Sequence, residues 1–233
     1  MKKIGFIGAY DKTDLIICIA KILTVLKKKV LIIDLTTNQK ARYVVPVINP
    51  TKMYVTDYED IDIAIGFTDI KEIKKYLGVS EEKELEYDVI MIDTDNFESF
   101  ETFELRESKH NYFVTSFDNY SLKRGLETLN QLKQVTALTK VYFAKSFIKE
   151  EDEYLNFLSL GYKIIWNDEK IYFPIENGDL SVLHENQRIA KIRFKKLSLQ
   201  FKESLAIIAQ EILEDKHGDN VRRAIKSIEK GVW

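Results

Sequence analysis

The fold of this 233-residue chain is decided by the stretch GAYDKTDL at residues 8–15. An almost unbroken apolar run, residues 4–7, comes before it, and a nearly all-apolar segment, residues 15–26, follows it. This order predicts a buried strand, a tight turn and a helix that is buried on most sides. In α/β proteins the first such turn lies at the carboxyl edge of the sheet, where phosphate groups commonly bind.

Further short apolar runs occur along the chain, at residues 30–33, 89–92, 112–115 and 141–144. Their length and lack of polar alternation are typical of strands that helices cover on both faces. Between them, residues 122–132 carry leucines at helical spacing, and we expect Asn119 to be the N-cap of that helix. A second helical stripe spans residues 197–212. The alternation predicts one α/β domain with a doubly wound, mostly parallel sheet flanked by helices.

The segment at residues 52–67 is harder to assign, because acidic side chains are interspersed among strand-forming residues. We expect an edge hairpin or a loop, since charges commonly protect the edges of sheets. A surface that binds a partner is the alternative.

Composition narrows the function classes. Hydrophobic residues make up 45% of the chain and the net charge is −2, so no global field attracts DNA or an anionic membrane. The lone Cys18 excludes an internal disulfide, and no apolar run reaches the length of a membrane span or signal peptide, so we expect a cytoplasmic protein. The three histidines have no metal-ligand spacing, and Gly5 and Gly8 give only part of a dinucleotide fingerprint.

The turn at residues 8–15 carries the residue types that a phosphate loop needs. Gly8 allows close backbone approach, Lys12 could contact phosphates, and the hydroxyl of Thr13 could bind magnesium. Two strands end in carboxylates, at Asp34 and Asp93, near the place where phosphate and magnesium would lie. A lysine–threonine pair alone is weak evidence for a phosphate loop. The order in which this pair, Asp34 and Asp93 follow one another along the chain is more specific.

This order resembles the ParA/MinD partition ATPases, a P-loop family of the SIMIBI class. Residues 114–122 resemble the passage that follows the Walker B strand in that family, and residues 171–174 resemble its proline-containing loop beside the adenine. The resemblance covers about 210 residues and implies ATP and Mg²⁺ as ligands. It implies nucleotide-binding roles for Gly8, Ala9, Asp11, Lys12, Thr13, Asp14, Asp34 and Pro174, and magnesium-binding roles for Thr13 and Asp93.

Several positions depart from the family pattern. Asp11 replaces the glycine before the lysine, Ile7 replaces a second lysine, and Asp14 replaces a hydroxyl residue. Thr36 stands where a second carboxylate organises the attacking water, and Asp95 stands where the family has proline. A carboxylate about 5 Å from a phosphate oxygen costs on the order of 3 kcal/mol. We therefore expect a degenerate Walker A motif with weak or lost ATP binding and no assignable catalytic residue.

Two functions follow from the resemblance. The first is a positioning or scaffolding subunit of a partition, pilus or secretion assembly, with weak or no ATP hydrolysis. The second is an active switch that dimerises with ATP, in which Asp11 and Asp14 pair with Lys12 or help to hold magnesium. Either function implies a homodimer, because family members dimerise across the nucleotide site, and the first implies a protein partner.

The chain divides into a P-loop domain at residues 1–217 and a C-terminal amphipathic helix or tail at residues 218–233. The tail has an apolar stripe bordered by basic residues, which predicts packing on the domain or on a partner. Peripheral membrane contact and DNA contact are the alternatives.

Overall fold

The computed structural model describes residues 1–48, 51–146, 148–175, 177–215 and 217–231. Its strands are β1 (Lys2–Ile7), β2 (Val30–Asp34), β3 (Tyr54–Asp57), β4 (Ile61–Ile65), β5 (Val89–Thr94), β6 (His110–Thr115), β7 (Thr136–Ala144) and β8 (Ile164–Pro174). Its helices are α1 (Thr13–Val25), α2 (Ala41–Val44), α3 (Ile70–Tyr76), α4 (Phe97–Thr102), η1 (Leu105–Glu107), α5 (Asn119–Asn130), α6 (Lys149–Leu158), α7 (Asn177–Ile189), α8 (Leu199–Leu213) and α9 (Asp219–Lys230).

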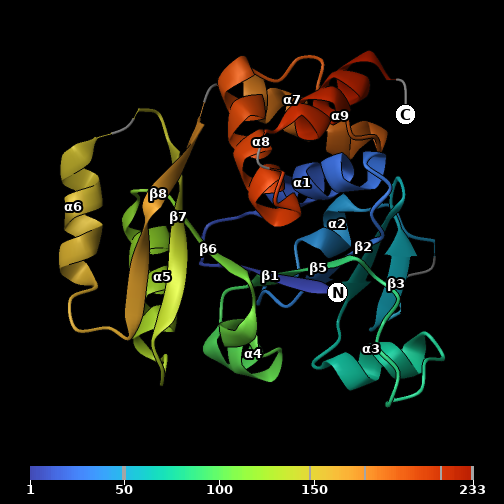
Figure 1. Cartoon of the computed structure of the whole chain (residues 1–233), viewed down its shortest axis with the longest axis horizontal. Coiled ribbons are helices and arrows are strands. Elements are labelled where there is room, and N and C mark those ends of the chain that lie inside the picture. The colour runs from blue at the N-terminus through green and yellow to red at the C-terminus, as the bar shows by residue number, and fades with distance from the viewer. Residues whose placement is uncertain (49–50, 147, 176, 216, 232–233) are drawn as a thin grey trace.

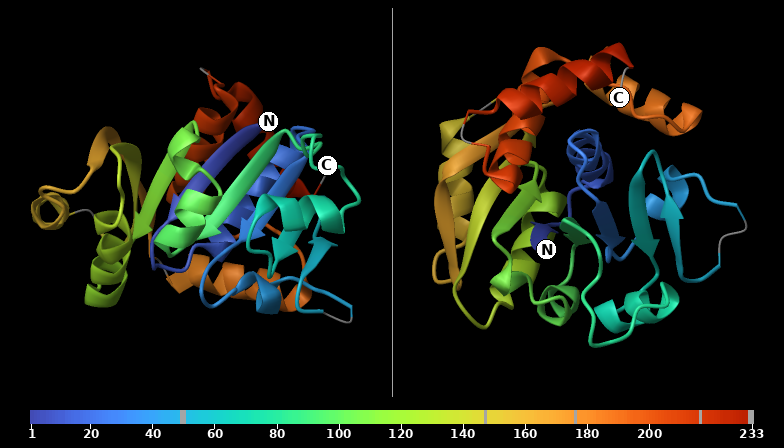
Figure 2. Two further views of the ribbon diagram at one scale, coloured as in Figure 1. Left: turned by 90° about the horizontal axis from the view of Figure 1, so that it is seen from below. Right: turned by 45° about the vertical axis from the view of Figure 1, so that its right-hand side comes forward.

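The strands form one sheet in the order β3-β4-β2-β5-β1-β6-β7-β8. Every neighbouring pair is parallel except β3 and β4, which are antiparallel. Figure 1 shows α1 and α7–α9 on one face of this sheet, and the views in Figure 2 show α3–α5 on the other. The predicted α/β class and the doubly wound, mostly parallel sheet are confirmed.

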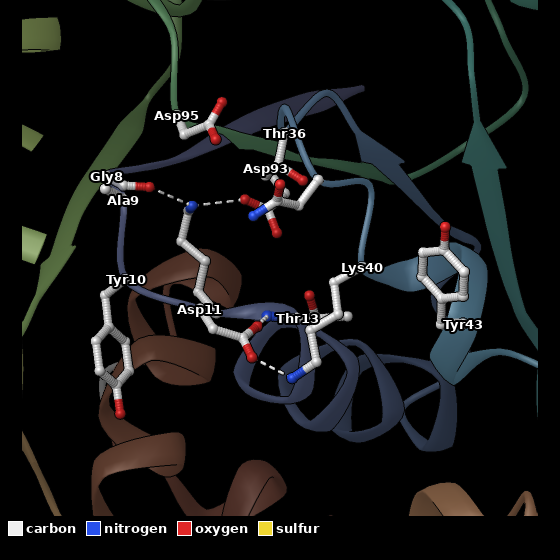
Figure 3. Close-up of a pocket in the computed structure, with 12 residues that line it drawn as sticks. Gly8, Ala9, Tyr10, Asp11, Thr13, Thr36, Lys40, Tyr43, Asp93 and Asp95 are labelled. Atoms are coloured by element: carbon white, nitrogen blue, oxygen red, sulfur yellow. Dashed lines mark hydrogen bonds and ion pairs between the residues drawn. The ribbon is translucent and has the colours of Figure 1, made fainter. Parts of the chain in front are cut away.

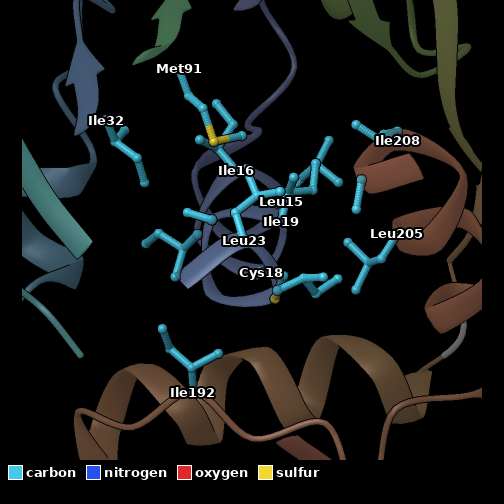
Figure 4. Close-up of a cluster of buried hydrophobic side chains, with 14 of the residues drawn as sticks. Leu15, Ile16, Cys18, Ile19, Leu23, Ile32, Met91, Ile192, Leu205 and Ile208 are labelled. Carbon is cyan, nitrogen blue, oxygen red and sulfur yellow. The ribbon is translucent and has the colours of Figure 1, made fainter. Parts of the chain in front are cut away.

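The helix α1 lies at the centre of the larger core. Its apolar residues are buried between the sheet and the helices α8 and α9, which explains why its sequence has no polar face. Figure 4 shows Ile16 and Leu23 near Ile32 and Met91 of the sheet, with Leu205 on α8 opposite. A rigid, buried α1 fixes the turn that precedes it.

Three adjacent strands bring the predicted site residues together. β1 and β2 both pair with β5, so that Asp93 lies beside Phe6 on one side and beside Asp34 on the other. The carboxyl ends of these strands therefore meet at the turn that starts at Gly8.

The structure corrects two local predictions about helix starts. The N-cap of α5 is Asp118 rather than Asn119, because the extended Asp118 accepts a hydrogen bond from the N–H of Ser121 at 2.9 Å. Leu197, predicted within the second helical stripe, precedes α8, whose N-cap is Ser198.

The structure corrects the prediction for residues 171–174 and confirms the hairpin expected at residues 52–67. Residues 171–174, expected to form a loop, are the last residues of β8, which pairs with β7 as far as Pro174. The acidic segment at residues 52–67 forms the expected hairpin, with β3 at the edge of the sheet and β4 buried between β3 and β2.

The helix α9 packs on α1 and α8 through its apolar stripe, as the sequence predicted. Its buried residues are Val221, Ala224, Ile225 and Ile228. Residues 232–233 of the predicted tail lie outside the described part of the chain. Within the described residues, no helix has the length and apolar content needed to cross a membrane.

Candidate functional site

The turn after β1 is held close to its neighbours by Gly8. The N–H of Gly8 donates to the carbonyl oxygen of Thr94 at 3.1 Å, and the φ angle of Gly8 is +133°. A Cβ atom at this position would lie 2.3 Å from the carbonyl oxygen of Val114 on β6. Glycine is therefore required here by the packing of the turn, whether or not a phosphate binds.

A cavity of about 500 Å³ opens at this turn (Figure 3). Its lining residues come from the turn, from the segment after β2 and from the end of β5. They are Gly8, Ala9, Tyr10, Asp11, Lys12, Thr13, Thr36, Asn38, Lys40, Tyr43, Asp93 and Asp95. The structure thus gathers Gly8, Ala9, Asp11, Lys12, Thr13 and Asp93 of the predicted site, but not Asp14, Asp34 or Pro174.

Lys12 is turned into the protein. Its Nζ donates a hydrogen bond to the carbonyl oxygen of Gly8 at 2.7 Å and forms an ion pair with Oδ1 of Asp93 at 2.7 Å. The side chain of Lys12 is 2% exposed and that of Asp93 is 4% exposed. The lysine expected to contact phosphates is therefore occupied by groups of the protein itself.

The environment of Asp93 opposes its ionisation. Burial raises its pKa to about 7, against the lowering effect of Lys12, and the nearby Asp34 adds to the rise. Near neutral pH the carboxyl group is therefore only partly ionised, and the nearby Lys12 favours its charged form. Lys12 is therefore its main counter-ion.

Asp11 pairs with Lys40 and not with Lys12, the partner considered from the sequence. Its carboxylate forms an ion pair with Nζ of Lys40, and its Oδ1 accepts a hydrogen bond from the N–H of Thr13 at 3.2 Å. Figure 3 shows Asp11 and Lys40 pointing toward one another, and both residues line the cavity. The negative charge that we expected to repel phosphate is thus balanced by a cation that the sequence did not identify, because no motif marks Lys40.

Asp14 lies beside this pair but outside the cavity lining. Nε2 of Gln187 on α7 donates to both of its carboxylate oxygens, at 2.9 and 2.8 Å, and Nζ of Lys40 is 3.8 Å away. Burial raises the pKa of Asp14. The alternative in which Asp11 and Asp14 pair with Lys12 does not match these contacts, since both acids face Lys40.

Asp34 holds the segment that follows β2. Its buried carboxylate accepts from the N–H and Oγ1 of Thr36, at 3.0 and 2.6 Å, and from the N–H of Ala41 at 3.0 Å. Asp95 accepts from the N–H of Thr37 at 3.0 Å. The two aspartates anchor residues 36–41 at the cavity.

Tyr10 separates the cavity from a second hollow of about 420 Å³. Its ring stacks on Phe143 with the ring centroids 4.7 Å apart. Ile175 lines this second hollow, whereas Pro174 faces another one beside α8. Tyr10, which the sequence did not single out, therefore forms a wall of the site.

The turn still offers donors to an anion. In the part of the chain that the structure describes, no residue accepts a hydrogen bond from the backbone N–H groups of residues 9–12. Consecutive free N–H groups before a helix suit a phosphate group. The carboxylates fit magnesium poorly, because Asp93 is paired with Lys12 and, among the described residues, no three acidic, histidine or cysteine side chains converge as metal ligands.

The fold matches solved structures at low sequence identity. The ParA family ATPase from Chlorobium tepidum TLS superposes with a TM-score of 0.57 and 13% identity over 89% of this chain and 97% of that chain. A complex of Cyanothece McdA with ATP gives 0.54 and 12%, over 92% and 96%. The MinD cell division protein of Aquifex aeolicus gives 0.50 and 13%, over 97% of both chains.

These likenesses show that the chain has a ParA/MinD-type fold. At the level of sequence, no family model and no curated protein matches the chain. A shared fold does not fix an activity, so the function must be argued from the site.

Proposed function

We propose that this chain, which has the ParA/MinD-type fold, is a cytoplasmic positioning or scaffolding subunit with weak or no ATP hydrolysis. It acts as a homodimer within a larger partition, pilus or secretion assembly. The observation that carries the proposal is the buried ion pair between Lys12 and Asp93. Lys12 and Asp93 both line the cavity, but in this pair the P-loop lysine and the Walker B carboxylate neutralise one another instead of facing a ligand.

The free energy of this ion pair opposes the binding of a ligand through Lys12. A ligand that recruits Lys12 must leave Asp93 buried without its cation, and breaking a buried pair in this way costs about 3–5 kcal/mol. Protonation of Asp93, whose pKa is about 7, would reduce that cost. Binding of a triphosphate through Lys12 is thus opposed before any contact with the ligand is counted.

Two further positions support the loss of turnover. The family has a second lysine at the position of Ile7, and that lysine would supply positive charge for phosphoryl transfer. In this chain the uncharged Ile7 is fully buried in β1. Thr36 bonds to Asp34 through its hydroxyl group and has no carboxylate with which to orient an attacking water. Among the described residues that line the cavity, Lys40 is then the one lysine besides Lys12.

An ATP-dependent dimerisation switch is the second candidate. The free N–H groups of residues 9–12 favour it, and so does the pairing of Asp11 with Lys40, which lowers the electrostatic repulsion that Asp11 would exert. In this case ATP and Mg²⁺ would bind at Gly8–Thr13 despite the altered loop. DNA and membrane contacts belong to neither candidate.

Light scattering separates the two candidates. We expect the mass of the purified protein to be that of a dimer and to stay the same with and without magnesium-ATP. A mass that rises only with magnesium-ATP, and does so in the wild type but not in Lys12→Met, would establish the switch. Phosphate release is measured in parallel. A steady rate above about 0.01 per second, far below typical turnover, would overturn the loss of hydrolysis.

A further inference from the structure

The two lysines of the cavity differ in what they can reach. Lys12 is buried against Asp93, whereas the side chain of Lys40 is 36% exposed and lines the same cavity. If an anion binds at this turn without disturbing the core, Lys40 is the cation that it can recruit. This argument rests on the proposed function, in which Lys12 stays with Asp93.

The backbone of Lys40 is well fixed. Asp34 accepts a hydrogen bond from the N–H of the next residue, Ala41, and Asp95 holds Thr37 at the other end of the segment. Asp34 is buried at the end of β2. Lys40 therefore projects toward the turn from a rigid base, and only its flexible side chain must move to change partners.

The head group of Lys40 lies between two acids. It pairs with Asp11 and is 3.8 Å from Asp14, while Gln187 already holds both oxygens of Asp14. Both partners of this pair are partly exposed to solvent, since the side chain of Lys40 is 36% exposed and that of Asp11 is 48% exposed. Exposed ion pairs are weak, so an anion of higher charge can compete for the lysine.

We propose that Lys40 is the anion-binding cation of this site and that Asp11 restrains it in the unliganded protein. The ligand class is a compound with two or more linked phosphate groups, held by Lys40 and by the free N–H groups of residues 9–12. Asp11 then limits the affinity of the site for this ligand. The ligand must break the ion pair between Asp11 and Lys40, and it then binds close to the negatively charged carboxylate of Asp11.

Titration calorimetry with sodium tripolyphosphate, without magnesium, tests this inference. Asp11→Asn keeps an oxygen that can accept from the N–H of Thr13 but frees Lys40, so we expect binding about tenfold tighter than in the wild type. Asp11→Asn/Lys40→Met should lose that gain, and Asp11→Asn/Lys40→Arg should keep it. Lys28→Met, an exposed lysine at the other end of β2, is the matched control and should bind like the wild type.

The inference is overturned if Asp11→Asn binds no tighter than the wild type, or if the Lys40→Met double variant keeps the tighter binding. Melting curves of each variant show whether it folds, and Lys40→Gln replaces Lys40→Met if that protein is unstable. The assay contains neither ATP nor magnesium. Its failure is therefore distinct from failure of the proposed function, which is measured by phosphate release and by mass.

Discussion

Nζ of Lys12 lies 2.7 Å from Oδ1 of Asp93, and both side chains are buried. These are the two groups on which a working phosphate loop would rely for phosphate and metal binding. In this chain they neutralise one another beneath the turn, and Gly8 accepts a further hydrogen bond from the lysine at 2.7 Å. The pair links the start of α1 to β5 and makes the loop part of the buried interior.

Lys12→Met tests whether the lysine is structural. The variant leaves Asp93 buried without a counter-ion, so we expect a loss of about 3 kcal/mol in the free energy of unfolding at pH 8. The loss should be smaller at pH 5, because Asp93, with a pKa raised to about 7 by burial, is then protonated and uncharged. Urea denaturation at both pH values measures this difference.

The double variant Lys12→Met/Asp93→Asn is the control for that experiment. It removes both charges while keeping similar side-chain volumes, and replacing a buried pair in this way is often nearly neutral. Recovery of most of the stability at pH 8 is expected. If the single variant is as stable as the wild type at both pH values, the pair does not hold the fold together.

Gly8→Ala should destabilise the protein by at least about 2 kcal/mol. The added methyl group would meet the carbonyl oxygen of Val114 at 2.3 Å, and the φ angle of +133° is strained for any other residue. Gly178→Ala on α7 is the matched control, because a Cβ atom there has no neighbour within 4 Å. Thermal melting compares the two, and equal melting temperatures would contradict this account of Gly8.

The parts of the fold that the sequence predicted are those in which burial dictates residue type. Helices cover both faces of the strands β1, β2, β5 and β6, so their unbroken apolar runs allowed these strands to be predicted. The helix α1 was predicted from its lack of a polar face. The strand β8 was missed as a whole, because Asn167–Lys170 interrupt its pattern, which an edge strand tolerates. Pro174 was expected in a loop because residues 171–174 resemble the proline-containing loop of the ParA/MinD family.

The sequence predicted the site residues whose positions are fixed by the ends of strands. It did not predict those whose positions depend on the course of a loop. Lys12 and Asp93 share the cavity because β1 and β5 are neighbours; the alternation of strands and helices predicts that both strands end at the same edge of the sheet, and the structure adds their order. Lys40 reaches Asp11 through a segment whose course depends on hydrogen bonds to Asp34 and Asp95. Such side-chain anchoring leaves no periodic signal in the sequence.

Glu211 on α8 should make stability depend on pH. Burial raises its pKa to about 7 and the adjacent Glu169 adds to the rise, although Tyr112 donates a hydrogen bond to its carboxylate. A folded-state pKa above the unfolded value of about 4.5 stabilises the protein at low pH, and that stabilisation is lost as the pH rises through 7. We expect lower stability at pH 8 than at pH 5.

Glu211→Gln should reduce this slope by about 1 kcal/mol between pH 5 and pH 8, a value discounted for the partial exposure of the side chain. Asp93 contributes in the same direction, so some slope remains. Glu203→Gln, on an exposed position of the same helix, serves as the control. Unfolding free energies at four pH values give the slopes, and an unchanged slope in Glu211→Gln would refute the assignment.

The helix α9 should act as part of the core and not as a membrane anchor. Ile228 is 2% exposed within the stripe that contacts α1 and α8, so binding a membrane through this stripe would require the helix to detach. We expect Ile228→Ala to cost about 2–5 kcal/mol, whereas Lys226→Ala, exposed on the same helix, should cost little. Co-sedimentation with anionic vesicles completes the test: both variants and the wild type should stay in the supernatant. Pelleting of the wild type that is lost in Ile228→Ala would show instead that the stripe leaves the domain to enter the lipid surface.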